Sequence, residues 1–202
     1  MAVKNNEQGR TMIEMILYIS ILIVMGAVLA QTAARIFKRY NVGRTSQQLI
    51  DIKKTILMFT AADEDYTKLS NQALQDANAV PLDMANMQHA LGGRIIVGPA
   101  TKFPDDTNDD SPNNKYMFFV TFDHIDRASC IELLSQGQFF TTGSEMDTLN
   151  VNNNWWQYKY SLFMTGNFKP ASQRLYQQRL NVNTALDACD KKTDNVITWI
   201  FS

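Results

Sequence analysis

The stretch EQGRTMIEMILYISILIVMGAVLA, Glu7 to Ala30, decides the fold of this chain. No charged residue occurs from Met15 to Ala30, and Ile, Leu, Val and Met dominate the run. About 20 apolar residues cross the hydrocarbon core of a membrane as a helix, so this segment is just long enough to span one. A single carboxylate, Glu14, lies near its start. Because a carboxylate in a membrane helix costs a few kcal/mol, Glu14 is a functional candidate that needs a partner.

Three interpretations of this segment compete. It could be a secretory signal, with Lys4 and Arg10 as its basic region and cleavage after Ala30. It could be a plain membrane anchor, but neither of these uses explains Glu14. In the third interpretation the chain is cut after Gly9, which leaves the free amine of Arg10 about 6 Å along the helix axis from Glu14. In a stack of staggered copies, the amine of one chain could then neutralise the glutamate of its neighbour and fix the register.

Gly9, followed by an apolar stretch with glutamate at the fifth position after the glycine, resembles the prepilin signature of type IV pilins and pseudopilins. The resemblance implies that a membrane prepilin peptidase removes residues 1–9 as a leader and that the new amine of Arg10 is methylated. It also implies assembly into a helical filament by an inner-membrane platform and an ATPase. Arg10 departs from the family pattern, which normally has a hydrophobic residue directly after the glycine.

The composition agrees with one ordinary globular domain beyond this segment. Apolar residues make up 45% of the chain and charged residues 19%, with a net charge of -1. That charge leaves no global field to attract nucleic acid, so nucleic-acid binding is set aside.

The N-terminal helix is expected to cover residues 10–62, because no proline occurs before Pro81. Its second half is amphipathic, since Leu49, Ile52, Ile56 and Phe59 recur at helical spacing. Gly43 is its weakest point. Basic residues follow the apolar run at Arg35, Lys38, Arg39 and Arg44. By the positive-inside rule these residues favour the cytoplasmic side of the membrane, which would place the N-terminus outside. The resemblance implies the opposite orientation, with the N-terminus inside.

Residues 63–202 are expected to form a globular head. A polar, helix-compatible stretch at 69–79 precedes a short strand at 94–97, stopped by Gly98-Pro99, and a clear strand at 115–125. A short helix at 126–137 has Asp126 as its N-cap, and strands at 155–168 and 195–201 complete the pattern. The predicted fold class is α+β, with the long N-terminal helix packed on a mostly antiparallel sheet.

The head adds to the resemblance. A double glycine entering a strand, the Ser129 to Leu134 pattern, and a cysteine shortly before the last strand look like the type IVb pilins of thin conjugative, toxin-coregulated and bundle-forming pili. The residues alone leave Cys130 and Cys189 open to being free thiols. The resemblance implies a head outside the cytoplasm, where a Cys130–Cys189 disulfide is expected. The stretch that it encloses is expected to be a surface loop.

Other candidates favour ordinary structural roles. The acidic loop of Asp105, Asp106, Asp109 and Asp110 lacks the glycine and glutamate of an EF-hand, so it is interpreted as a solvated loop. His89 and His124 have no nucleophile pattern around them. Of Trp155 and Trp156, one is expected in the core and one exposed, with adhesion a minor alternative. No cofactor, metal site or enzymatic activity is expected.

The sequence thus predicts a structural, non-enzymatic subunit of a type IV pilus of the type IVb group, with a single-pass precursor in the inner membrane and an extracellular filament. A minor pilin or secretion pseudopilin shares the same N-terminus. Two alternatives belong to other classes of protein. A secreted binding domain or enzyme would begin at Gln31 after cleavage of a signal peptide. A permanently anchored periplasmic domain would keep its leader.

Overall fold

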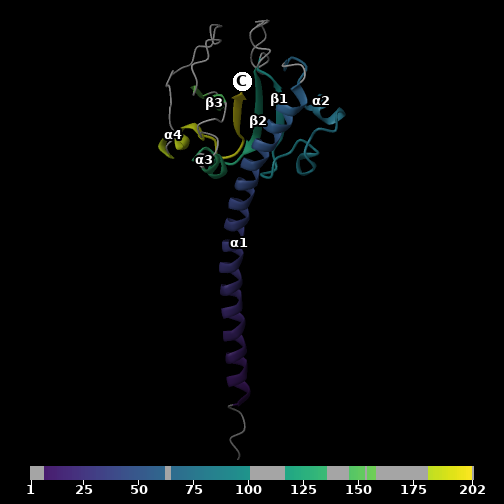
Figure 1. The fold of residues 1–202 in the computed structure, drawn as a ribbon. Coiled ribbons are helices and arrows are strands. Elements are labelled where there is room, and N and C mark those ends of the chain that lie inside the picture. Colours follow the sequence, from purple (N-terminus) through teal and green to yellow (C-terminus); the bar gives the residue numbers. More distant parts are fainter. Residues whose placement is uncertain are drawn as a thin grey trace, which may run out of the picture. The chain divides into compact units, whose positions relative to one another are not determined.

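The computed structural model of the chain describes residues 7–61, 65–100, 117–135, 146–152, 154–157 and 182–201. Its helices and strands, shown in Figure 1, are α1 (Glu7–Thr60), α2 (Asn71–Asp76), the 3-10 helix η1 (Leu82–Met84), β1 (Ile95–Pro99), β2 (Phe118–Ile125), α3 (Arg127–Ser135), β3 (Met146–Val151), β4 (Asn154–Gln157), α4 (Val182–Ala188) and β5 (Asn195–Phe201). The chain divides into two compact units, Met1–Tyr40 and Asn41–Ser202, so the boundary falls inside α1.

The second unit contains one five-stranded sheet with the order β1-β2-β5-β3-β4. Every neighbouring pair is antiparallel, and Trp199 at the centre of β5 lies opposite Val120 of β2 and Leu149 of β3. Together with the long N-terminal helix and the disulfide described below, this sheet confirms the predicted α+β fold class.

The last turns of α1 belong to the core of this unit. Leu49, Ile52 and Ile56 are at most 1% exposed and join the same cluster as the β2 and β5 side chains. Apolar residues at this helical spacing form one buried stripe, as the sequence indicates. Phe59 was expected on that stripe, but it is 42% exposed; Thr60, four residues after Ile56, is instead the buried residue of the last turn, at 7% exposure.

Polar contacts also hold this part of α1 to the head. The buried amide of Gln48 accepts a hydrogen bond from the backbone N–H of Ala90 at 2.8 Å and donates one to the carboxylate of Asp83 at 3.1 Å. Arg44 lies 3.7 Å from the same carboxylate. Gln48 therefore ties η1 and the turn before β1 to the helix.

The outer edge of β1 is closed by side-chain and main-chain partners. The amide of Asn71, the first residue of α2, donates to the carbonyl oxygen of Ile95 and accepts from the N–H of Val97, both at 2.7 Å. The N–H of Ile95 donates to the carbonyl oxygen of Met87 at 2.7 Å. Pro99 has no N–H to satisfy, which is why the strand includes it although Gly98-Pro99 was expected to stop the strand.

A disulfide joins Cys130 of α3 to Cys189, the residue after α4, with 6.0 Å between their Cα atoms. The N-cap prediction for α3 is confirmed, because the Asp126 carboxylate accepts from the N–H groups of Ala128 and Ser129 at 3.1 and 3.2 Å. The expectation of a surface loop between the two cysteines is wrong. That stretch supplies β3 and β4, two of the five strands of the sheet.

Candidate functional site

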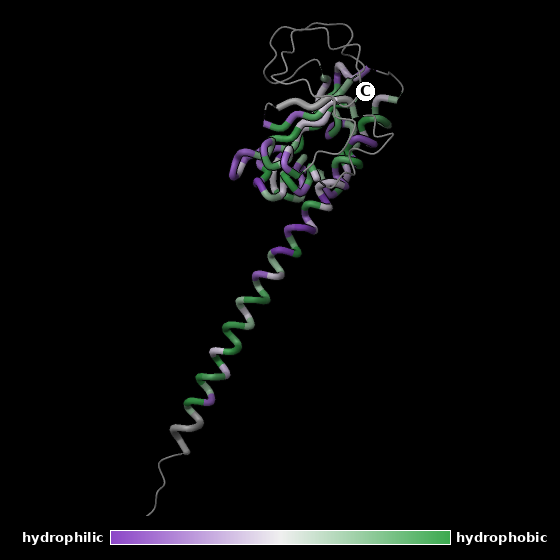
Figure 2. The backbone as a smooth tube through the Cα atoms, turned by 90° about the vertical axis from the view of Figure 1, so that its left-hand side faces the viewer, coloured by the Kyte–Doolittle hydropathy of each residue, from purple (hydrophilic) through white to green (hydrophobic). Residues whose placement is uncertain are grey.

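The first unit is a helix whose apolar side chains are exposed on every side. From Met12 to Tyr40, the large hydrophobic residues are between 48% and 71% exposed. Figure 2 shows this part of the helix mostly in the hydrophobic colour. Within the described residues, α1 is the one helix long and apolar enough to cross a membrane. Such a surface must be covered by lipid or by other protein, because water would be an unfavourable neighbour for all of it.

The polar groups of this segment differ in how they are satisfied. The hydroxyl of Ser20 donates to the carbonyl oxygen of Ile16 at 2.9 Å, and that of Thr32 to Val28 at 2.9 Å. Both can therefore enter an apolar environment without an unpaired donor. Glu14 is exposed, and its carboxylate has no hydrogen-bond or ion-pair partner among the residues that the structure describes. It is the one acid between Arg10 and Asp51.

The predicted cleavage residues lie close to this acid. Gly9 and Arg10 are part of the helical backbone of α1, five and four residues before Glu14 respectively. Residues four apart lie on the same face of a helix, so Arg10 and Glu14 share a face. Cleavage after Gly9, methylation of Arg10 and pairing with the Glu14 of a second copy stay predictions.

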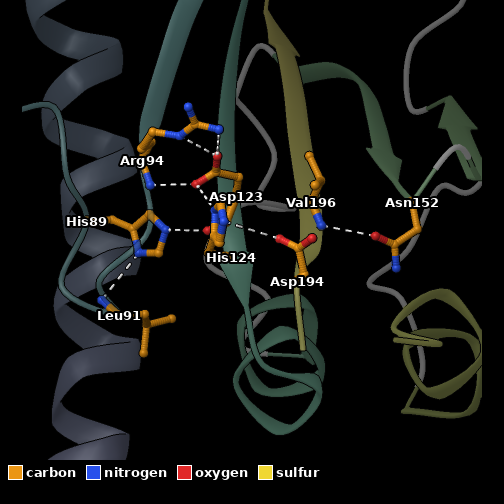
Figure 3. A network of polar contacts seen from close by, with 8 residues as sticks. All are labelled: His89, Leu91, Arg94, Asp123, His124, Asn152, Asp194 and Val196. Carbon is orange, nitrogen blue, oxygen red and sulfur yellow. Dashed lines mark hydrogen bonds and ion pairs between the residues drawn. The ribbon is translucent and has the colours of Figure 1, made fainter. Parts of the chain in front are cut away.

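The second unit contains a polar network around Asp123, shown in Figure 3. The Asp123 side chain is 6% exposed. It accepts hydrogen bonds from the backbone N–H of Arg94 at 2.6 Å and from its Nε at 2.8 Å, and Nδ1 of His124 lies 2.8 Å away. Burial works against the ionised carboxylate, but these hydrogen bonds from His124 and Arg94 outweigh it and hold the pKa of Asp123 below its usual value.

The two histidines occupy opposite environments in this network. His89 is 3% exposed; its Nε2 donates to the carbonyl oxygen of Asp123 at 2.8 Å, and its Nδ1 accepts from the N–H of Leu91 at 3.3 Å. Burial lowers the pKa of His89, and its Nδ1 carries no proton in this arrangement because it accepts the Leu91 N–H. His124 is 59% exposed, and its hydrogen bond to the Asp123 carboxylate raises its pKa.

The geometry gives these residues a structural task. His124 has a φ of 55° where the β2–β5 register shifts, and its Nε2 lies 3.7 Å from Asp194, the residue before β5. The network therefore connects β1, the bulge in β2 and the start of β5. Within the described ranges, no group of three or more His, Cys, Asp or Glu side chains is placed to hold a metal ion.

Sequence reasoning missed a second network beside the disulfide. The Asn152 side chain, after β3, donates to the carbonyl oxygen of Ala188 at 3.1 Å and to Asp190 and Asn195 at 2.8 Å each. Its oxygen accepts from the N–H of Val196 at 3.0 Å. Asparagine tolerates the left-handed φ of 49° found there. The signal was present in the Asn-rich turn between two strands, but its long-range partners are set by the tertiary fold.

Two expectations fall outside what the structure describes. The acidic loop of Asp105, Asp106, Asp109 and Asp110 is outside the described residues. Trp155 and Trp156 lie in β4, opposite Asn150 and Leu149 of β3, but their side chains are also outside the described part.

No family model and no curated protein sequence matches this chain. Among solved structures, it is similar to TcpA, a type IV pilin from Vibrio cholerae El Tor biotype, at 14% identity and a TM-score of 0.49, covering 81% of this chain and 99% of that one. It is also similar to a type IV b pilin from Salmonella typhi, at 14% identity and a TM-score of 0.44, covering 79% and 97%.

Proposed function

We propose that this chain is a structural, non-enzymatic subunit of a type IV pilus, of the type IVb group. Its precursor is a single-pass protein of the inner membrane with the head outside. A prepilin peptidase cuts between Gly9 and Arg10, the new amine is methylated, and an inner-membrane platform with its ATPase adds the subunit to an extracellular filament. The filament serves adhesion, aggregation or conjugation.

The observation that carries this proposal is the single unpartnered acid, Glu14, on an otherwise exposed apolar helix. In a filament the helices of other copies cover that apolar surface, and the surface they bury would stabilise the assembly at about 25 cal/mol per Å². A carboxylate buried in such a bundle without a partner costs several kcal/mol. The amine of Arg10 created by cleavage supplies the partner. A copy in the wrong register would leave its Glu14 carboxylate buried without that amine, which makes the misaligned assembly less stable.

The head supports the same orientation. A disulfide forms and persists in oxidising compartments and is rare in the cytosol. The Cys130–Cys189 disulfide is therefore what a head that leaves the cytoplasm is expected to carry. The helix and the head thus agree with a membrane-anchored precursor.

The first experiment determines the mature N-terminus. The full chain is co-expressed with a prepilin peptidase, and the product is sequenced from its N-terminus. We expect Arg10 as the first residue and an uncut chain for Gly9→Val. A first residue of Gln31 would instead identify an ordinary secreted domain, and a leader left uncut by active peptidase would identify a permanently anchored one.

The second experiment separates the charge of Glu14 from its shape. Glu14→Gln keeps the size of the side chain and removes the charge, and we expect it to reduce sheared filaments at least tenfold while leaving the cleaved subunit in the membrane. Glu7→Gln is the matched control, because that residue is removed with the leader. Normal filament yield from Glu14→Gln would rule out the assembly role.

A further inference from the structure

A run of cations follows the apolar part of α1. Between Met15 and Ile50 every charged residue is basic, and three of the four lie in the first unit: Arg35, Lys38 and Arg39. All three side chains are exposed. Their spacing of three and four places them on one face of the helix. We call these three residues the basic collar.

The collar lies at the depth of a membrane surface. At a rise of 1.5 Å per residue, the helix from Glu14 to Arg35 is roughly 32 Å long. The hydrocarbon core of a bilayer is about 30 Å thick, so when Glu14 is at one boundary, Arg35 is at the other. Phe37 and Tyr40 are 68% and 63% exposed at the same level. Aromatic and basic side chains are the residues that anchor a helix at the headgroup level.

The charge of the collar opposes the orientation of the chain. The disulfide indicates a head outside the cytoplasm, which puts the collar on the outer side of the membrane. Basic residues next to a membrane helix favour the cytoplasmic side during insertion. Cations that work against insertion need a compensating interaction on the side where they end.

We propose that the basic collar binds the phosphate headgroups of anionic phospholipids in the leaflet next to the head, and so holds the precursor at a fixed depth. A guanidinium binds phosphate oxygens in a bidentate manner, and the collar carries two of them, on Arg35 and Arg39. A second copy at the same level offers no carboxylate, because none occurs between Glu14 and Asp51. The inference rests on the membrane orientation in the proposed function and not on filament assembly.

The test measures lipid selectivity of the full, uncleaved chain in bilayers. The protein is reconstituted with spin-labelled phosphatidylglycerol or phosphatidylcholine, and the motionally restricted fraction of each lipid is compared. Each Lys or Arg near an anionic surface contributes a factor of up to about five. We therefore expect the wild-type chain to prefer phosphatidylglycerol several-fold, and rising salt to weaken that preference.

Three variants separate the collar from general charge. Arg35→Gln/Arg39→Gln is expected to lose most of the preference, and Arg35→Lys/Arg39→Lys, which keeps the charge but loses the bidentate geometry, to keep only part of it. Lys54→Gln/Lys68→Gln removes the same charge from exposed positions of the head unit and should change nothing. Equal restriction of both lipids by the wild type, or full selectivity in the double Gln variant, would overturn the proposal. A failure of the proposed function appears separately, as an uncut leader in a chain that still prefers phosphatidylglycerol.

Discussion

The imidazole of His89 donates a hydrogen bond to the backbone carbonyl oxygen of Asp123, with 2.8 Å between Nε2 and the oxygen. The same ring stacks on Phe122 with 5.1 Å between centroids. This contact brings the turn before β1 against the bulged end of β2. It requires a residue without a side chain at Gly93, because a Cβ there would overlap the Asp123 carbonyl and the His89 ring.

Gly93→Ala should therefore destabilise the head. The neighbouring atoms include main-chain atoms of β2, which cannot move aside as a flexible side chain could, so we expect a loss of about 2–4 kcal/mol in the free energy of unfolding. Urea unfolding of the full chain in detergent, followed by tryptophan fluorescence, measures it. Gly43→Ala is the control: it has open space at its Cβ within α1 and should be neutral or up to about 1 kcal/mol stabilising. Equal stability of Gly93→Ala and wild type would refute this packing.

His124 should stabilise the head more at low pH than at high pH. Its pKa is raised in the folded state by Asp123, so its contribution is complete below the unfolded pKa of about 6.5 and is lost as the pH rises through the raised value. His124→Asn tolerates the left-handed backbone and removes the titration. The difference in unfolding free energy between wild type and variant should be larger at about pH 5.5 than at about pH 9. A difference independent of pH would contradict the ion pair.

His89 should produce the opposite pH dependence. Burial lowers the pKa of His89 in the folded state. When the pH falls below about 6.5, this histidine therefore becomes protonated in the unfolded chain before it does so in the folded one. The free energy of unfolding declines over that range, until the pH reaches the folded pKa. His89→Gln should lower the free energy of unfolding at neutral pH, because it loses the stacking on Phe122. It should also reduce the further decline of stability on acidification, because glutamine does not titrate. The measurement is the same unfolding series, and an unchanged decline on acidification would show that His89 does not titrate between the two states.

The local patterns of this chain were readable from its sequence, and the contacts across the head were not. Alternating apolar residues and helical spacing identified β2, β5 and both parts of α1, and Asp126 marked the start of α3 by its chemistry alone. By contrast, β3 carries Asp, Thr and Asn among its apolar residues and was not predicted. Its partner β5 is far away in sequence, and only that pairing makes the segment a strand.

The candidate site divides in the same way. Glu14 could be found from sequence because a lone acid in an apolar run is a local anomaly. Asp123 stands next to a histidine in an apolar strand, but its burial and its pairing with Arg94 depend on the β1–β2 register. Asn71 is one polar residue in a polar helix, and nothing local distinguishes it from Gln72. Its role arises from the strand edge that the fold places beside it.

Asn71→Ala should open that strand edge. It leaves the carbonyl oxygen of Ile95 and the N–H of Val97 without the Asn71 amide. An unsatisfied, partly buried donor or acceptor costs about 1–3 kcal/mol. An unpaired edge also favours pairing with another chain. We expect lower stability in urea together with greater self-association in light scattering. Gln72→Ala, which loses an exposed bond to Asp76 on the same helix, should show neither effect. If both variants behave alike, the closure of β1 by Asn71 is wrong.

Removing the disulfide should lower the free energy of unfolding at least as much as any of the substitutions above. The bond closes a loop with a sequence separation of 59, for which the chain-entropy model gives about 4 kcal/mol. Both cysteines are 0% exposed, so Cys130→Ala/Cys189→Ala avoids the buried hydroxyls that serine would introduce. We expect the free energy of unfolding to fall by about that amount.

The control for this variant is wild-type protein unfolded with and without a thiol reductant. Because the disulfide is buried, the reductant should act only once the head unfolds, and the reduced wild type should then match the double alanine variant. β3 and β4 lie within the closed loop, and Asn152 binds the carbonyl oxygen of Ala188 next to Cys189, so loss of the bond should loosen this side of the sheet first. Hydrogen exchange should accordingly rise in β3 before β1. Equal exchange in both strands would mean that the disulfide stabilises the head as a whole rather than the region that it encloses.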